Sequence, residues 1–427
     1  MKKTFTILLL AAIHFGSYAQ ANQELNSLIL QSFTYFPRIK ELNKTTELRE
    51  LQIELSQSSY LPTVNGVGSY TYLNPISQKA LPIGPNETAN LKFQPYNNYN
   101  LNVAVNQVVW DFGKIHSQIE KSKADLLVAK QNTEVARLQL AAQVASVYYS
   151  MIYLKKSVVV QDSVISFYRE NRKIVEGKIK QGDALQIDLS NIENNIDQEQ
   201  NRKVEFLRQY ERQAALMRFS TGQSSEPTVA DFDFKSIEGA ADVSNNPEVL
   251  AASERISSAK ADAKLAESNK LPVLSVQAGA GFKNGYQPDI NPLRFNYLGG
   301  LTLNVPIFQG GKLGQSVKLA HKTVELNEYS KATLTSTLQK DLESVLSDIK
   351  AYNEQMKNAD GQIAVANESQ RLTQVRYKQG IVTYLDLINA STNVQRAYLN
   401  KLQYEYQRTV AQIELYRLTG SKFWQEQ

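Results

Sequence analysis

Residues that could bind phosphate or catalyse a reaction are few in this chain. Gly310, Gly311 and Lys312 have the composition of a phosphate-binding loop. That motif, however, needs a glycine where Pro306 stands and a serine or threonine where Leu313 stands. We therefore expect no nucleotide site at this position.

The other reactive side chains form no better set. The chain has three histidines and no cysteine, which excludes disulfides, thiolate metal sites and a catalytic thiol. His116 and His321 are the two histidines beyond the N-terminal segment, and they do not occupy equivalent positions in the internal repeat described below. With four methionines in all, a soft-metal path also lacks support. The sequence predicts a protein that is not an enzyme and holds no metal or cofactor.

The charges are mixed along the chain, and the net charge is only +5. A nucleic-acid-binding protein would need its basic residues clustered on one face. Mixed charge is typical of solvated helix surfaces instead, so we expect no nucleic acid among the partners.

The N-terminus has the features of a secretory signal peptide. Two lysines near the start precede an apolar run from Ile7 to Ile13, and small residues follow. We expect a signal over residues 1–19, with Ala21 as the alternative cleavage site. No later segment approaches the roughly 20 apolar residues of a membrane-spanning helix.

The sequence contains a large internal repeat. Short motifs recur at a constant separation of 198 residues, and they start at Gly113 and Gly311, Lys180 and Lys378, Asp188 and Asp386, and Thr221 and Thr419. Upstream, Pro37 matches Pro247 at a separation of 210, so the first copy has extra residues between Leu61 and Val105. A repeat of this size defines the architecture. We expect a first copy over 20–222, an equatorial linker over 223–246, a second copy over 247–420 and a tail over 421–427.

Each copy is predicted to contain one long helix and two shorter ones. A helix between Gly113 and Gly182 would span roughly 100 Å at about 1.5 Å per residue. In each copy one shorter helix is expected to begin at a proline, Pro37 or Pro247. The other shorter helix follows the long one and is expected to end at a C-cap glycine, Gly222 or Gly420. The second long helix also has a heptad pattern, made by Leu338, Leu342, Val345, Ile349, Tyr352, Met356, Ala359 and Ile363.

Four segments alternate between apolar and polar residues, as strands do. They are Leu61–Leu73, Asn100–Asn106, Val273–Phe282 and Leu301–Ile307. Alternation of this length is typical of a membrane-spanning barrel strand, although a small soluble sheet with one buried face is the alternative. Tyr70, Tyr72 and Trp110 near strand ends favour the membrane interpretation, because aromatic residues gather at lipid interfaces. Four strands cannot close a barrel and open edges are not viable in lipid, so several chains must share one barrel.

With these features the chain resembles the outer membrane efflux proteins of the TolC type. The motifs that carry the resemblance are the tandem repeat, Asn246-Pro247-Glu248, the pairs Leu61-Pro62 and Leu271-Pro272, the Gly-Lys motifs, the segment Tyr377 to Asp386, and Leu418 to Gly420. Each motif is weak alone, but their order and spacing are specific, and they cover almost the whole mature chain.

The resemblance implies an α+β membrane protein built from a tandem structural repeat. Three chains would form a 12-stranded β-barrel, four strands per chain, continuous with a long periplasmic α-helical barrel. Such a homotrimer is the passive exit duct of a tripartite efflux or type I secretion system. Its partners are outer membrane lipid, a periplasmic adaptor protein and an inner-membrane transporter.

The resemblance also implies a gate at the periplasmic helix turns. A tyrosine–aspartate contact of the family matches Tyr377 and Asp188, and an aspartate ring matches Asp386, with Asn389 one turn later. A second contact of the family joins an arginine to a threonine, and this chain departs from that pattern with Val382 and Ile187. Capping of a helix N-terminus is the alternative role for both aspartates. The docking surface would be the turns, at Lys180, Gln181, Gly182, Lys378, Gln379 and Gly380.

A different class of protein also has long helical hairpins. A periplasmic adaptor, or a structural coiled-coil protein, is therefore the alternative function. An adaptor should contain one hairpin flanked by small β-domains, rather than two copies that each follow a pair of alternating strands.

Overall fold

The fold was analysed in a computed structural model that describes residues 23–85, 87–223, 227, 231, 232, 234 and 241–425. The predicted signal peptide and most of the predicted linker over 223–246 lie outside these residues. Two compact units divide the chain. The hairpin unit comprises Met1–Lys44, Lys130–Ala252 and Ser330–Gln427, and the sheet unit comprises Thr45–Ala129 and Ser253–Tyr329.

Two very long helices and four shorter ones follow the predicted order. They are α2 (Pro37–Ser58), α3 (Lys114–Gln181), α4 (Gln186–Thr221), α5 (Pro247–Ser268), α6 (Lys312–Lys378) and α7 (Tyr384–Thr419). Proline is the first residue of α2 and α5, where its missing N–H has no intrahelical partner to lose. Gly222 (φ 78°) and Gly420 (φ 74°) end α4 and α7 in the left-handed conformation, as predicted. A further helix over residues 23–35 was not expected from the sequence.

Within the described ranges, none of these helices has a stretch that is both apolar enough and long enough to cross a bilayer.

The sheet unit is built around one four-stranded antiparallel sheet. Its strands are β1 (Thr63–Tyr72), β4 (Asn97–Trp110), β5 (Val273–Lys283) and β6 (Arg294–Asn304), in the order β1-β4-β5-β6. The prediction of four strands is thus confirmed, but β6 begins and ends earlier than expected and overlaps the predicted segment Leu301–Ile307 only at residues 301–304. One further pair was missed: β2 (Gln78–Gly84) and β3 (Glu87–Lys92) form a separate hairpin inside the extra residues of the first copy. Pro82 and Gly84 interrupt the β2 pattern, which hides this strand from a search for alternation.

The register divides the sheet into an apolar and a polar face. Leu101 lies opposite Phe282, and Phe282 lies opposite Phe295, so these side chains share one face with the other apolar residues of the alternation. On the other face Asn100 and Asn102 oppose Lys283 and Gly281. A bulge between Val108 and Trp110 brings Trp110 opposite Leu274, which moves its ring to the apolar face.

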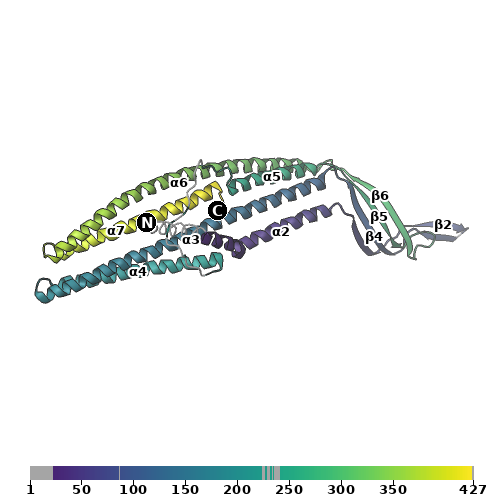
Figure 1. Cartoon of the computed structure of the whole chain (residues 1–427). Helices are drawn as coiled ribbons and strands as arrows, with labels where there is room; N and C mark the ends of the chain where they lie inside the picture. Colours follow the sequence, from purple (N-terminus) through teal and green to yellow (C-terminus); the bar gives the residue numbers. More distant parts are fainter. Residues whose placement is uncertain are drawn as a thin grey trace, which may run out of the picture. The chain divides into compact units, whose positions relative to one another are not determined.

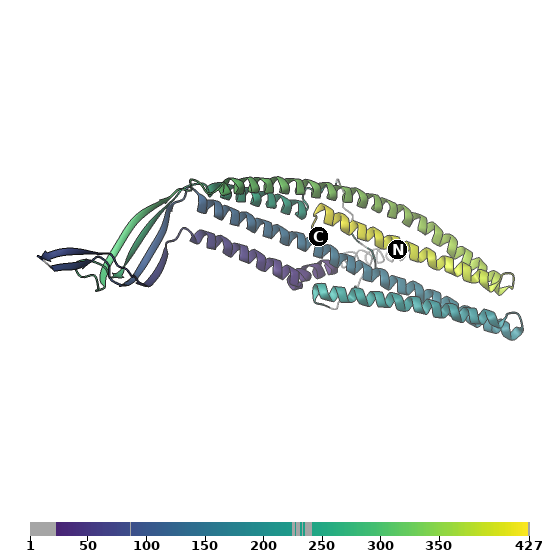
Figure 2. The ribbon, with the colours of Figure 1, turned by 180° about the vertical axis from the view of Figure 1, so that it is seen from behind.

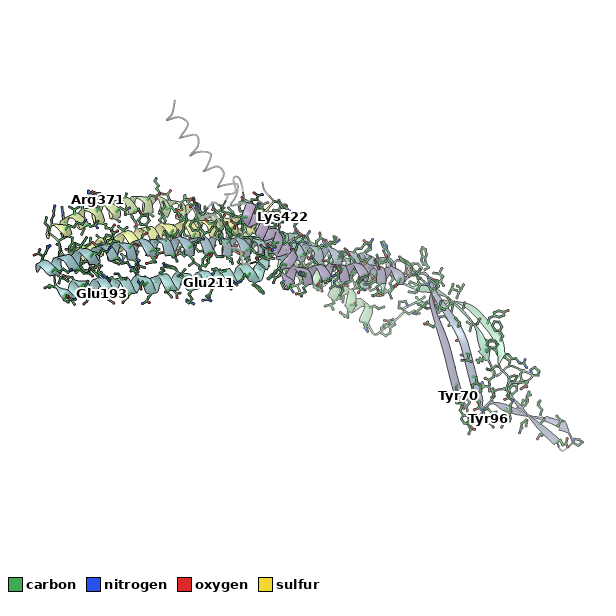
Figure 3. All side chains as sticks on the ribbon, turned by 60° about the horizontal axis from the view of Figure 1, so that its bottom comes forward. Tyr70, Tyr96, Glu193, Glu211, Arg371 and Lys422 are labelled. Carbon is green, nitrogen blue, oxygen red and sulfur yellow. The ribbon has the colours of Figure 1, made fainter. Side chains whose placement is uncertain are left out.

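Aromatic residues gather at the end of the sheet that carries the strand loops. Tyr70 packs on Tyr99 with ring centroids 5.3 Å apart, and Tyr72 stacks on Tyr96 at 6.3 Å. Figure 3 shows Tyr70 and Tyr96 near this end, and the β2–β3 hairpin extends past it in Figures 1 and 2. At the other end of the sheet unit, α5 packs on α6 through Ala263, Ala266 and Ala320.

The hairpin unit contains two antiparallel helix pairs and the helix over residues 23–35. In Figures 1 and 2 α4 returns alongside α3, and α7 returns alongside α6. The predicted heptad forms a buried seam: Leu338 and Leu342 pack with Leu415 and Leu418 of α7. Charged side chains such as Glu193, Glu211 and Arg371 are exposed on the helix surfaces (Figure 3). A narrow apolar seam with a polar exterior is what the sequence predicted for these helices.

Candidate functional site at the helix turns

The two turns that join the paired helices form the candidate docking surface. Gly182 (φ 83°) follows α3 and Gly380 (φ 75°) follows α6, and both adopt the left-handed conformation that glycine allows. A Cβ at either glycine would meet no atom within 4 Å, so both turns border open space. The predicted docking side chains beside them are all exposed: Lys180, Gln181, Lys378 and Gln379. Their contact with an adaptor stays a prediction.

Asp386 lies in the first turn of α7 and helps to cap the N-terminus of that helix. The backbone N–H of Thr383 donates to Oδ2 of Asp386 at 2.9 Å, and the Thr383 hydroxyl donates to the same atom at 2.7 Å. The Asp386 N–H donates back to Thr383 Oγ1 at 3.3 Å, which completes a capping box. The hydroxyl and then the backbone bond from Thr383 hold the pKa of Asp386 below its usual range. The carboxylate remains exposed, so capping does not prevent it from lining a pore.

Asp188 has the equivalent place in α4 but a weaker cap. The Leu185 N–H donates to Asp188 Oδ2 at 3.2 Å, and Leu185 has no hydroxyl to add a second bond. This single bond leaves most of the carboxylate's hydrogen-bonding capacity free.

Tyr377 is buried, with 5% of its surface exposed. It belongs to the apolar cluster beneath the turns, whose other buried members are Val164, Tyr168, Val175, Ile192, Ile196, Tyr384 and Leu387. Its ring lies 6.0 Å from that of Tyr384, which belongs to the same cluster. Burial, and to a smaller extent the charge of Asp188, raise the pKa of Tyr377. Among the described residues, however, no hydrogen bond joins Tyr377 to Asp188. The two residues are brought within electrostatic reach, and their predicted gate contact stays a prediction.

Lys178 is a contact at the turns that the sequence analysis missed. Its Nζ donates a 2.8 Å hydrogen bond to the carbonyl oxygen of Tyr377 and lies 4.6 Å from the centre of that ring. The contact joins the end of α3 to the end of α6, so it links the two helix pairs within one chain. The sequence did contain one indication of this contact. Lys178 and its repeat equivalent Arg376 both lie in the last turn of a long helix, where basic side chains can bind free backbone carbonyl groups.

The remaining gate positions differ in exposure. Asn389 is exposed on α7, as a residue facing a constriction would be. Val382 packs against the apolar cluster beneath the turns, whereas Ile187 is 58% exposed. Neither side chain can make the arginine–threonine hydrogen bond, so that contact is absent from this chain.

A buried polar cluster ties three helices together away from the turns. Gln395 Nε2 on α7 donates to Glu199 Oε2 on α4 at 2.7 Å and to Gln161 Oε1 on α3 at 3.2 Å. Arg202 completes the cluster with a 2.7 Å bond to the other oxygen of Glu199. Gln161, Glu199 and Gln395 are each at least 95% buried. Since buried polar groups need specific partners, this cluster fixes the register of the three helices.

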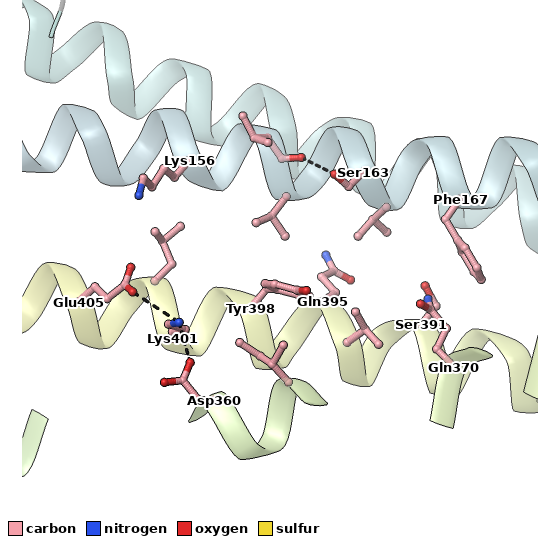
Figure 4. Close-up of a pocket in the computed structure, with 16 residues that line it drawn as sticks. Lys156, Ser163, Phe167, Asp360, Gln370, Ser391, Gln395, Tyr398, Lys401 and Glu405 are labelled. Atoms are coloured by element: carbon pink, nitrogen blue, oxygen red, sulfur yellow. Dashed lines mark hydrogen bonds and ion pairs between the residues drawn. The ribbon is translucent and has the colours of Figure 1, made fainter. Parts of the chain in front are cut away.

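A groove of about 890 Å³ runs between the two helix pairs (Figure 4). Val159, Val164 and Phe167 of α3 contribute to its apolar part. On the opposite side Lys401 Nζ lies 2.6 Å from Asp360 Oδ1 and 3.9 Å from Glu405 Oε1. An apolar strip beside an ion-pair network matches the two faces of an amphipathic helix.

Paired long helices with exposed turns, together with a sheet that is apolar on one face, are the features of a membrane-associated channel. The sequence model of the outer membrane efflux protein family matches residues 36–223 and 243–421. The chain therefore belongs to the outer membrane efflux protein family, and it is an outer membrane protein of efflux systems.

Individual proteins agree with this assignment. The pyoverdine export outer membrane protein OpmQ of Pseudomonas putida is 22% identical over 77% of this chain and 71% of its own length. A crystal structure of CusC has a TM-score of 0.78 at 16% identity, covering 93% of this chain and 92% of that one. The Campylobacter jejuni CmeC outer membrane channel has a TM-score of 0.76 at 17% identity, covering 93% and 85%. The predicted fold class, with its helical part and its β-domain, is confirmed by these structures.

Proposed function

We propose that three copies of this chain assemble into a passive exit duct, with one shared 12-stranded barrel and one helical barrel. The observation that carries the proposal is the sheet itself. Its outer strands, β1 and β6, have a free edge each, and its apolar face includes Leu101, Phe282 and Phe295. A free edge in lipid leaves backbone groups without partners, so β1 of one chain must pair with β6 of the next.

The duct would be a passive conduit that catalyses no reaction. We infer that its exposed turns meet a periplasmic adaptor, and that the groove between the helix pairs receives a helix of that adaptor. The inner-membrane transporter would supply the energy. The two repeat copies, residues 20–222 and 247–420, would each contribute one helix pair to the helical barrel and two of the chain's four barrel strands.

The gate would lie at the same end as the docking turns. Three copies of Asp386 near one axis would repel one another and attract cations, with Asn389 one turn further along. Tyr377, Asp188 and Lys178 would hold the two helix pairs together in the closed state. Docking at the turns would then bias the gate toward opening, because both features involve the same ends of α3 and α6.

Cross-linking tests the shared barrel directly, since the chain has no cysteine of its own. Cysteines on the polar face of β1, at Asn65 or Ser69, combined with cysteines on β6, at Asn296 or Thr302, should yield covalent trimers after oxidation. Cysteines at Asn102 and Gln277 on the two central strands serve as the control and should yield monomers only. The trimer should also conduct ions in planar bilayers. A monomer released from cells by buffer alone would favour the periplasmic adaptor or coiled-coil alternative.

Docking is tested by bulky substitutions at the turns. Leucine at both Gly182 and Gly380 should abolish export while trimers still form. Gly361 is a matched control, because it lies inside α6 and a Cβ there meets no atom within 4 Å. Gly361→Ala should therefore leave export intact, and normal export by the turn variants would remove the turns from the docking surface.

A further inference from the structure

The four strands of the sheet contain only two charged side chains, and both are cationic. Lys283 is the last residue of β5, and Arg294 is the first residue of β6. The register places them directly opposite each other, so they share one face of the sheet. That face is the polar one, because Lys283 also lies opposite Asn100.

Neither cation has a carboxylate partner among the described residues. Arg294 Nη1 donates to the carbonyl oxygen of Gln287 at 3.2 Å, which leaves its charge uncompensated. Lys283 is exposed and forms no ion pair with any residue in the described ranges. The nearest acid in the β5–β6 loop, Asp289, accepts from the backbone N–H of Asn291 instead.

Two like charges directly opposite each other lower the stability of an antiparallel pair. The remainder of the polar face is neutral, with asparagine, glutamine, serine, threonine and glycine at most positions. A destabilising pair in an otherwise uncharged surface indicates a role outside folding. The pair lies at the loop end of the sheet, opposite the end that leads into the helices.

We propose that Lys283 and Arg294 form an anion-binding ring at the outer mouth of the duct. This inference rests on the proposed trimer, in which the polar face lines the barrel and three pairs bring six cations to one rim. A ring of cations in a narrow aqueous opening concentrates multivalent anions and repels multivalent cations. The class of ligand is therefore a polyanion such as a polyphosphorylated or polycarboxylated solute.

Calorimetric titration of the detergent-solubilised trimer with inositol hexakisphosphate tests the ring. We expect one polyanion per three chains, with an affinity that weakens when KCl rises from about 0.1 M to about 1 M, since the screening length falls from ~10 Å to ~3 Å. The double variant Lys283→Gln and Arg294→Gln should bind at least tenfold more weakly. It should form trimers that melt no lower than the wild type, because a repulsive pair is removed.

The β2–β3 hairpin provides the matched control. Lys79→Gln removes a cation from the neighbouring hairpin but spares Lys92, whose carbonyl oxygen is bonded to Gln287, and should leave the affinity unchanged. Equal binding by the Lys283 and Arg294 double variant, or loss of binding in the hairpin control instead, would overturn the ring. A chain that forms no trimer at all would overturn the proposed function rather than this assignment alone.

Discussion

Gln395 on α7 donates a 2.7 Å hydrogen bond to the carboxylate of Glu199 on α4, and this bond joins the two helix pairs of the hairpin unit. Gln395 is 4% exposed and Glu199 is 5% exposed, so neither side chain can replace its partner with bulk water. The same amide group of Gln395 reaches Gln161 on α3. One side chain on α7 thus connects both helices of the first pair.

Removing this amide should destabilise the hairpin unit. Gln395→Ala leaves a buried oxygen of Glu199 without a donor, which costs about 2–3 kcal/mol. We expect a lower thermal unfolding midpoint in detergent, followed by circular dichroism of the helices. Asn393→Ala, at an exposed position on the same helix, is the control and should change the midpoint little. Equal midpoints for the two variants would show that the buried cluster does not stabilise the fold.

The contact between Lys178 and Tyr377 should influence gating. Lys178→Met keeps the aliphatic part of the side chain but removes the 2.8 Å bond to the Tyr377 carbonyl and the cation above its ring. We expect a several-fold rise in the open probability of single channels in planar bilayers. Tyr377→Phe and Asp188→Ala should also raise conductance if their contact forms in the closed trimer.

Lys180 supplies the control for this gating prediction. It lies two residues further along and is exposed at the turn. Lys180→Met therefore removes the same charge without removing a link between α3 and α6. Identical gating of the Lys178 and Lys180 variants would mean that net charge, rather than the contact, sets the open probability.

Helix ends and strands that depend on residues within their own segment were predictable from the sequence. Proline and glycine positions predicted where α2, α4, α5 and α7 begin or end, because these residues act on their own stretch of backbone. The alternation predicted the four strands of the sheet, since one face had to be apolar throughout.

Contacts between distant residues were not predictable in the same way. The bond from Lys178 to Tyr377 joins residues 199 positions apart, and a backbone carbonyl leaves no mark in the sequence. The Gln395 cluster likewise depends on the packing of three helices, and glutamine on a helix is usually solvated. The β2–β3 hairpin was missed for a different reason: Pro82 and Gly84 interrupt the alternation of apolar and polar residues in β2.

The stability contributed by Asp386 should depend on pH. The bonds from Thr383 lower the pKa of this carboxyl in the folded chain, so its contribution is present above the unfolded value of 3.8 and is lost as the pH falls through the lowered folded value. Wild type and Asp386→Asn should therefore differ in unfolding midpoint at about pH 5 and converge toward about pH 2. A constant difference over this range would argue against the capping box.

Asn246 should be the most sensitive single position at the start of the second repeat copy. Its side-chain amide donates to the carbonyl oxygens of Arg417 at 3.1 Å and Leu418 at 2.9 Å, while its Oδ1 accepts from the Glu248 N–H at 2.7 Å. One fully buried side chain therefore caps the N-terminus of α5 and the C-terminus of α7 together. Asn246→Ala should lower stability by about 2–3 kcal/mol, because an N-cap is lost and carbonyl groups lose a donor.

The substitution Asn246→Asp separates the two roles of this residue. An aspartate still accepts from the Glu248 N–H, but its second oxygen would face two carbonyl oxygens that need a donor. Asn246→Asp should therefore be more destabilising than Asn246→Ala near neutral pH, which reverses the usual order of N-cap residues. Unfolding midpoints of the two variants measure this order, with Asn245→Ala at the exposed neighbour as the control. If aspartate proved the milder change, the bonds to the end of α7 would contribute little and the N-cap alone would explain the residue.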